Sequence, residues 1–82
     1  MHVTVISPER AVFDGSADAV VAPAFDGQVG ILPRHASFMT LLGSGEMTVQ
    51  AGGTAARFRL SGGFLQVVGD AVRVVADQVE MA

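Results

Sequence analysis

Short runs of alternating apolar and polar residues, separated by glycine pairs, recur along this chain. Apolar residues occupy every second position in residues 46–51, and again in residues 56–61. A period of two is typical of a half-buried antiparallel strand. Gly52 and Gly53 lie between the two runs, and glycine suits a tight reversal because it tolerates positive φ. The pattern therefore predicts a β-hairpin.

A second hairpin is predicted directly after the first. Residues 64–68 and 71–76 are rich in valine, and the pair Gly69-Asp70 separates them in the order that suits a type II′ turn. Valine is stiff at χ1 and packs well on a pleated surface, which favours a strand in both runs. The first of these strands is apolar on both faces.

The N-terminal third of the chain also indicates short strands. Residues 2–5 alternate until Pro8 interrupts them, residues 10–13 begin a further strand, and residues 18–22 form an apolar run that stops at Pro23. No stretch of ten or more residues has a convincing helical pattern. The best helical candidate is 35–42, which a short strand fits as well. Many short strands with glycine turns predict an all-β sandwich or flattened barrel.

Length and composition narrow the class of protein. The 82 residues are enough for a single domain, here residues 1–82, that buries roughly 62% of its unfolded surface. Burial on this scale leaves little net free energy of folding, which favours a domain that gains stability from a partner. Half of the residues are hydrophobic and only 16% are charged, which excludes intrinsic disorder.

Several functions are excluded by residue types that the chain lacks. Without cysteine there is no disulfide, thiolate nucleophile or sulfur-ligated zinc, and without lysine there is no biotin or lipoate attachment and no Schiff base. Five scattered arginines and a net charge of −3 argue against nucleic acid binding. Neither a signal peptide nor an uninterrupted apolar run of membrane-spanning length is found. We expect no direct membrane insertion.

Candidate catalytic groups are few. Ser37, His35 and Asp26 form a triad on paper, but any chain with several serines and aspartates offers such sets. His2 lies on the polar side of the first predicted strand, and no spacing supplies converging metal ligands. We therefore expect no catalytic residue, no metal site and no cofactor-binding site.

The segment from Asp26 to Arg34 has an unusual composition for a loop. Val29, Ile31 and Leu32 stand there among glycine and proline, where a solvated loop is expected to be polar. Two readings are open: the loop folds back over the open end of the sandwich, or its tip faces another protein.

Four segments resemble one known family in collinear order. They are VISPERAVFDG (5–15), APAFDGQVGILPRHA (22–36), LLGSGEMTV (41–49) and SGGFLQV with VRVVAD (61–77). Together they resemble the N-terminal β-sandwich of the epsilon subunit of the F-type ATP synthase. The resemblance implies a flattened ten-stranded β-sandwich with jelly-roll-like topology. It also implies a non-catalytic place in the central stalk, in the rotor that proton flow turns during ATP synthesis.

Contact residues follow from the resemblance by position. It implies that the gamma subunit is faced by Ser7, His35 and Thr40. It implies that the c-subunit ring is approached by Gln28, with the apolar Val29, Ile31 and Leu32 beside it. Gln28 is neutral where the family often has an acidic or other polar side chain, so no salt bridge to the ring is expected there. Aspartate at position 31 or 32 is expected to weaken assembly while leaving the domain folded.

The family resemblance also gives expectations about regulation and location. Family members normally continue into a helical hairpin that in some members binds ATP, whereas this sequence stops at residue 82. We expect no regulatory hairpin and no bound nucleotide in this chain. A peripheral location at the cytoplasmic face of a bacterial inner membrane is expected. Two alternatives are a free-standing all-β interaction module, which would fail to recover gamma in a pull-down, and a small hydrolase that depends on His35.

Overall fold

The computed structural model describes residues 1–34 and 36–81, and this part of the chain forms eight strands and no helix. The strands are β1 (His2–Ile6), β2 (Ala11–Ser16), β3 (Ala19–Ala24), β4 (Gly27–Ile31), β5 (Phe38–Leu41), β6 (Ser44–Ala51), β7 (Thr54–Val68) and β8 (Ala71–Met81). Within the described residues there is accordingly no helix with the length and apolar character needed to cross a bilayer.

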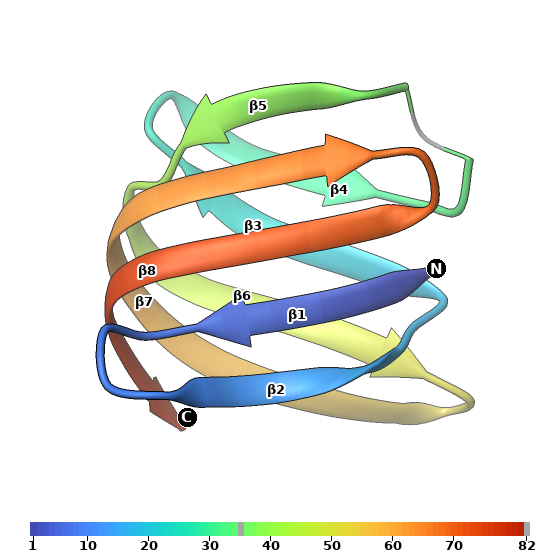
Figure 1. The fold of residues 1–82 in the computed structure, drawn as a ribbon, viewed down its shortest axis with the longest axis horizontal. Coiled ribbons are helices and arrows are strands. Elements are labelled where there is room, and N and C mark those ends of the chain that lie inside the picture. The colour runs from blue at the N-terminus through green and yellow to red at the C-terminus, as the bar shows by residue number, and fades with distance from the viewer. Residues whose placement is uncertain (35, 82) are drawn as a thin grey trace.

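The eight strands make two layers that face each other (Figure 1). β7 pairs with β6 through residues 54–61 and with β5 through residues 64–67, so this one strand takes part in both layers. β8 does the same, because residues 71–75 pair with β1 and its C-terminal end pairs only with the first part of β7. The first layer has the order β2-β1-β8-β7-β5, and the second has the order β8-β7-β6-β3-β4.

A glycine pair lets β7 pass from one layer to the other. Gly62 and Gly63 have φ angles of 70° and 102°, in the left-handed region that other residues rarely adopt. A Cβ on Gly63 would collide with the main chain of Val75 and lie 2.7 Å from the Cα of Ala76. The predicted strands 56–61 and 64–68 are therefore one bent strand. The structure has eight continuous strands. Ten are obtained when β7 and β8 are counted once in each layer, which explains the difference from the expected number.

Both predicted hairpins are confirmed, and their turns have the expected backbone. Gly52 and Gly53 have φ angles of 57° and 84° between β6 and β7. Gly69 has a φ angle of 58° between β7 and β8, while Asp70 stays at negative φ, as a type II′ turn requires. Residues 38–41 are a strand, so the helical alternative for this segment is wrong.

Two sequence expectations need correction. β3 continues through Pro23, which was expected to end it. Proline fits because β6 pairs with β3 only at Ala19–Val21. No residue of β6 therefore needs a hydrogen bond from a main-chain N–H at position 23. The segment expected to be an apolar loop contains β4, which pairs with β3 over five residue pairs.

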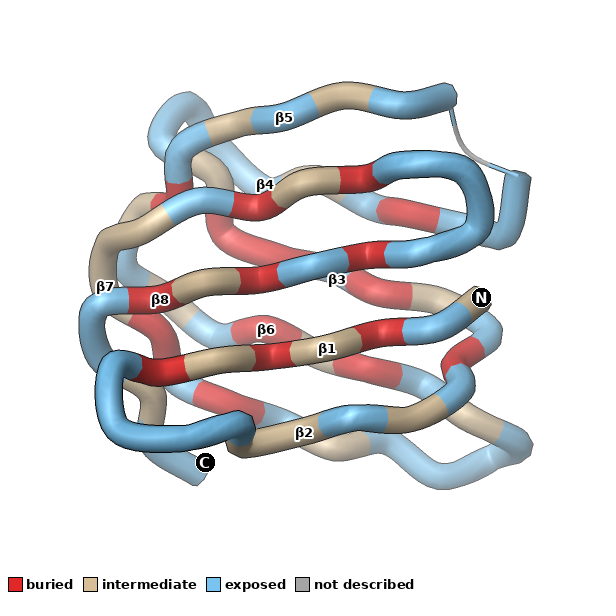
Figure 2. Tube along the Cα trace, viewed as in Figure 1, coloured by how far each residue is buried: buried red, intermediate tan, exposed pale blue. Residues whose placement is uncertain are grey.

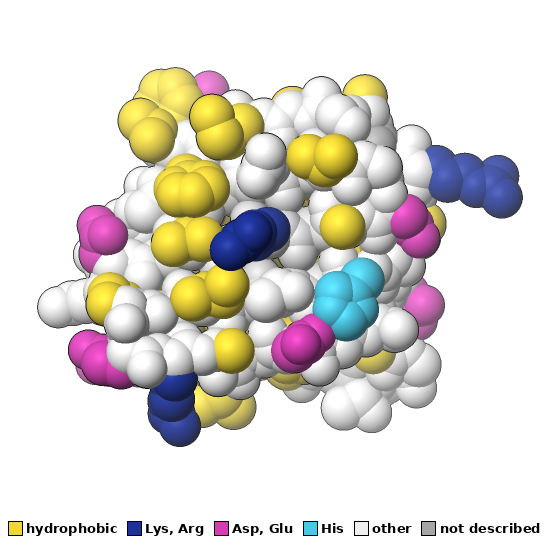
Figure 3. All heavy atoms as spheres, viewed as in Figure 1, with side chains coloured by type: hydrophobic (Ala, Val, Ile, Leu, Met, Phe, Trp, Pro, Cys, Tyr) yellow, Lys and Arg dark blue, Asp and Glu magenta, His cyan; other side chains and the backbone are white. Residues whose placement is uncertain are grey.

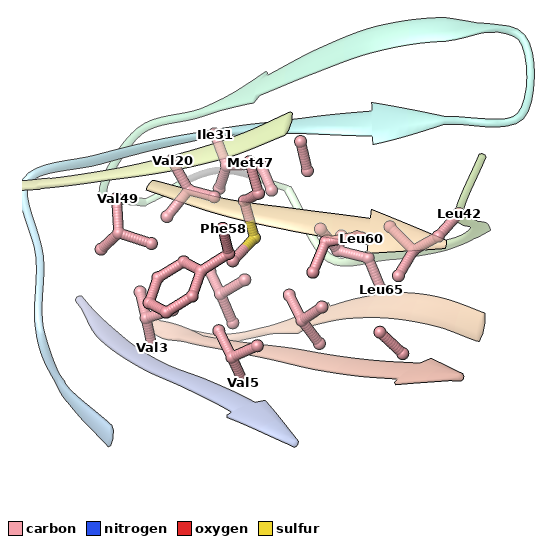
Figure 4. Packing of buried hydrophobic residues seen from close by; sticks show 14 of the residues in the cluster. Val3, Val5, Val20, Ile31, Leu42, Met47, Val49, Phe58, Leu60 and Leu65 are labelled. Atoms are coloured by element: carbon pink, nitrogen blue, oxygen red, sulfur yellow. The ribbon is translucent and has the colours of Figure 1, made fainter. Parts of the chain in front are cut away.

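The core lies between the layers and is built from residues at alternate strand positions (Figure 2). Figure 4 shows side chains from both layers pointing toward one another around Phe58 and Met47. Phe13 packs edge-on against Phe58 with ring centroids 5.9 Å apart. Ser7 is the only buried polar residue among those described. The described core is thus almost entirely apolar, and the side chains that could contact a partner lie on the outer surfaces.

Candidate protein-interaction surface

An uninterrupted line of apolar side chains crosses the outer face of the first layer. Leu41 pairs with Phe64, Phe64 with Val75, and Val75 with Ile6. These four residues, here called the apolar row, share the outward side because their strand neighbours Leu65, Val74 and Val5 are fully buried. The row therefore spans four adjacent strands from β5 to β1.

A shallow hollow of about 440 Å³ widens one end of the row. Its lining is almost entirely apolar, with Phe25, Met39 and Leu41 exposed to 67%, 68% and 62%. The remaining lining residues are Thr40 and Phe64. Figure 3 shows hydrophobic side chains gathered in a column across this face. A contiguous exposed apolar patch of this kind marks a binding surface.

Main-chain hydrogen bonds fix the hollow in place. The N–H of Phe25 donates to the carbonyl of Leu41 at 3.0 Å, and the N–H of Gly43 donates to the carbonyl of Pro23 at 2.9 Å. These bonds tie the end of β3 to the end of β5. The exposed Phe25 and Leu41 side chains are therefore presented from a held backbone rather than from a free loop, which lowers the ordering cost of binding.

The outer face of the second layer is polar by contrast. Arg57 lies 3.9 Å from Glu46 between Nε and Oε1, and the hydroxyls of Ser44 and Ser61 lie 3.4 Å apart. Arg59 pairs across strands with Glu46 on one side and Glu80 on the other. Solvated charged and hydroxyl side chains leave little apolar area on this face for a partner to remove from water. The two outer faces thus differ, and only the first offers a dry contact surface.

Two of the residues expected to face gamma lie at opposite ends of the apolar row. Thr40 lines the hollow, and its hydroxyl donates to the carbonyl of Leu41 at 3.4 Å. Ser7 follows Ile6 and is 7% exposed. Its hydroxyl donates to the carbonyl of Arg10 at 3.1 Å and accepts from the Arg10 N–H at 3.3 Å, so Ser7 holds the turn between β1 and β2. The third, His35, lies outside the described residues.

The residues expected to meet the ring divide into exposed and buried positions. Gln28 is exposed on β4, and Leu32 is 62% exposed just after it. Val29 is half-buried and packs on the core. Ile31 is 1% exposed and belongs to the core, which corrects the expectation of a surface contact at this position. Aspartate at position 31 would therefore disrupt folding rather than assembly alone.

Two of the residues considered for catalytic chemistry have contacts in the described part of the chain. The Ser37 hydroxyl accepts a hydrogen bond from the N–H of Gly69 at 3.3 Å, which is a contact between loops. The candidate triad also needs His35, which lies outside the described residues. His2 contacts Asp14 at 2.5 Å on the exposed face of β1 and β2. Within residues 1–34 and 36–81, no three metal-ligating side chains gather.

With the fold and surface described, comparison with known proteins assigns the family. The sequence matches the family described as "ATP synthase, Delta/Epsilon chain, beta-sandwich domain" over residues 1–82. The chain belongs to this family.

Curated epsilon chains are similar along the whole sequence. The ATP synthase epsilon chain of Chloroflexus aurantiacus is 42% identical over 82 residues, which is all of this chain and 59% of the relative. The epsilon chain of Desulforamulus reducens is 44% identical over 81 residues, which is 99% of this chain and 61% of the relative. The chain thus spans about three fifths of these epsilon chains.

Solved structures share the sandwich. A chain in the mitochondrial ATP synthase of Euglena gracilis, solved as an OSCP/F1/c-ring assembly, superposes with a TM-score of 0.89 at 21% identity, covering 96% of this chain and 51% of that one. A chain in the central stalk/c-ring assembly of Tetrahymena thermophila gives 0.81 at 17% identity, covering 99% and 66%. At these identities the likeness shows the fold.

Local sequence patterns do not predict most of the apolar row. Leu41, Phe64, Val75 and Ile6 come from four strands, and only the register brings them side by side. One signal was present, because a strand apolar on both faces, such as 64–68, carries apolar residues on the side that does not face the core. Phe64 stands on that outward side.

Proposed function

We propose that this chain is a non-catalytic rotor subunit of an F-type ATP synthase, joining the gamma subunit to the c-subunit ring so that proton flow is coupled to ATP synthesis. Its curated relatives are ATP synthase epsilon chains, and its structural neighbours come from assemblies that contain the c-ring. The work of such a subunit is mechanical: it offers surfaces and transmits load without making or breaking bonds. Its place is peripheral, at the cytoplasmic face of a bacterial membrane.

The apolar row is the observation that carries the proposal. We assign it, with the hollow beside Thr40 and the turn held by Ser7, to gamma. A permanent neighbour removes such a surface from water, and each Å² of apolar area buried contributes roughly 25 cal/mol before the costs of association. Phe64 and Leu41 are neighbours in the apolar row, where the hollow widens it. We expect these two side chains to contribute most of the binding free energy.

The second surface lies around β4 and is assigned to the ring. Gln28 and Leu32 are the exposed members, and neither carries charge. Contact with the ring would thus rest on amide hydrogen bonding and apolar packing, with little dependence on salt. Ile31 acts from inside, where its core packing anchors the end of β4 beneath Leu32.

Capture of gamma tests the proposal. The tagged chain is co-expressed with the gamma subunit of the same organism, and gamma is measured in the purified fraction. Phe64→Ser is expected to weaken retention by at least about tenfold, the effect of losing a central apolar anchor. Arg57→Ser, on the outer face of the second layer, is the matched control and should retain gamma fully. Equal retention by both variants at unchanged melting temperature would refute the assignment.

A further inference from the structure

The two layers have four edges, and three of them are protected against pairing with another strand. β2 carries Asp14, and the register between β1 and β2 shifts at Ile6. The free end of β8 carries Asp77 and Glu80. At the edge of β5, the carbonyl of Leu41 already accepts a hydrogen bond from Phe25. Charge, irregular register and occupied carbonyls are the usual defences of an edge strand.

β4 has none of these defences. Its sequence GQVGI contains no charge and no proline, and its pairing with β3 has no register shift. Figure 1 shows it at the outer edge of its layer. An uncharged, regular edge with free main-chain groups is a template for a further strand.

The pairing with β3 shows which main-chain groups of β4 are free. Pro23 pairs with Gln28, yet Pro23 has no N–H, and its carbonyl accepts from Gly43 at 2.9 Å on the far side. This pair is therefore a non-hydrogen-bonded one, and by alternation the N–H and C=O groups of Gln28 and Gly30 point to the open side. Among the described residues, none donates to or accepts from these outward groups.

Gly30 makes the edge accessible to close approach. A Cβ built at this position would have no heavy atom within 4 Å, and its φ lies outside the left-handed region. A strand Cβ points out of the sheet face, so the outer face above the middle of β4 is open and no side chain of Gly30 stands over an added strand.

We propose that β4 pairs with β4 of a second copy of this chain, antiparallel and with the two-fold axis at Gly30. In this register the two Gly30 residues exchange hydrogen bonds, and Gln28 lies opposite Leu32 of the second copy. Asp26 lies in the turn just before β4 and Arg34 in the turn just after it, so antiparallel pairing brings the end of β4 that carries Asp26 toward the end of the second copy's β4 that carries Arg34. Among the described residues Asp26 and Arg34 have no ion-pair partner, so the two opposite charges complement each other across the axis.

The proposed dimer is weak and excludes the rotor-bound state. A single shared strand buries less than the roughly 1,200 Å² of a standard interface, so a dissociation constant on the order of 100 µM is expected. Because Gln28 and Leu32 are also assigned to the ring, which rests on the proposed function, a chain paired through β4 cannot occupy that site. Dimerisation would hold unassembled chains apart from the ring.

Sedimentation of the purified chain over a concentration series tests the dimer. Wild-type protein is expected to dimerise, with the amides of Gln28 and Gly30 gaining hydrogen-exchange protection as concentration rises. Gly30→Lys, which places a charge on the open edge, should abolish dimerisation, whereas Gly30→Ser should keep it. Asp26→Arg and Arg34→Asp should each weaken association by about fivefold or more, and the double variant should restore it.

Three results would overturn the proposal. One is a wild-type chain that stays monomeric at millimolar concentration. Another is a dimer that survives Gly30→Lys but is dissociated by Phe64→Ser, because the apolar row would then be the interface. The third is a double variant, Asp26→Arg with Arg34→Asp, whose loss of affinity is the sum of the two single losses rather than a return to wild-type affinity. The first and third results leave the capture of gamma, which is measured separately, unaffected, whereas the second also bears on the apolar row assigned to gamma.

Discussion

Replacing Gly63 by alanine tests the bend through which β7 serves both layers. Alanine at a φ of 102° is strained, at a cost of about 1–3 kcal/mol. Its Cβ would also collide with the Val75 carbonyl and lie 2.7 Å from the Ala76 Cα, and main-chain atoms cannot rotate away as a flexible side chain can. We expect a total loss of at least ~3 kcal/mol of unfolding free energy.

Urea and thermal denaturation of the purified chain measure this loss. For a domain of this size each kcal/mol shifts the melting temperature by about 4–8 °C, so Gly63→Ala should lower it by at least about 12 °C. The matched control is Gly30→Ala, where a Cβ meets nothing within 4 Å and φ is ordinary. That change should be neutral or stabilise by up to about 1 kcal/mol, because alanine restricts the unfolded chain.

The outcome is decided by the difference between the two variants. If Gly63→Ala melts within a few degrees of Gly30→Ala, β7 can bend without a glycine there. Gly63 would then not be the residue that lets one strand join both layers.

Other predictions concern single side chains. Ile31→Ala should lose about 2–5 kcal/mol, since the side chain is 1% exposed in the core, and a smaller loss by denaturation would place it at the surface. Leu32→Asp, at 62% exposure, should keep the melting temperature but reduce co-purification of the ring, and normal recovery of the ring would contradict that role. Ser7→Ala should cost about 1 kcal/mol, because two hydrogen bonds to Arg10 are lost; no change in urea midpoint would show that water replaces them. Asp18→Ala should cost about 0.5–1.5 kcal/mol, because the Asp18 carboxylate, just before β3, accepts from the Gly52 N–H at 2.8 Å in the turn between β6 and β7, and Asp18→Asn should recover part of it.

Local patterns of the sequence were sufficient to predict the hairpins and the class of fold. The alternation around Gly52 and the order Gly69-Asp70 are readable because turn chemistry acts over two or three residues. Glycine and proline in and around residues 27–31 make β4 resemble a solvated loop in the sequence. Only pairing with β3, a non-local event, makes residues 27–31 a strand.

The candidate surface was predictable only in part. Thr40 and Gln28 could be placed through the family resemblance, yet the apolar row depends on the register of four strands. Ile31 and Leu32 are adjacent and equally apolar, but a strand places successive side chains on opposite faces. One is therefore in the core and the other in solvent, and a hydropathy reading of the segment treats them alike.

Methyl NMR of the labelled chain with and without the gamma subunit tests most directly whether the apolar row binds gamma. We expect the methyl signals of Leu41, Val75 and Ile6 to shift or broaden on binding. Those of Val21 and Ala55, on the outer face of the second layer, should stay unchanged. Binding that perturbs Val21 and Ala55 but leaves the apolar row untouched would contradict this expectation.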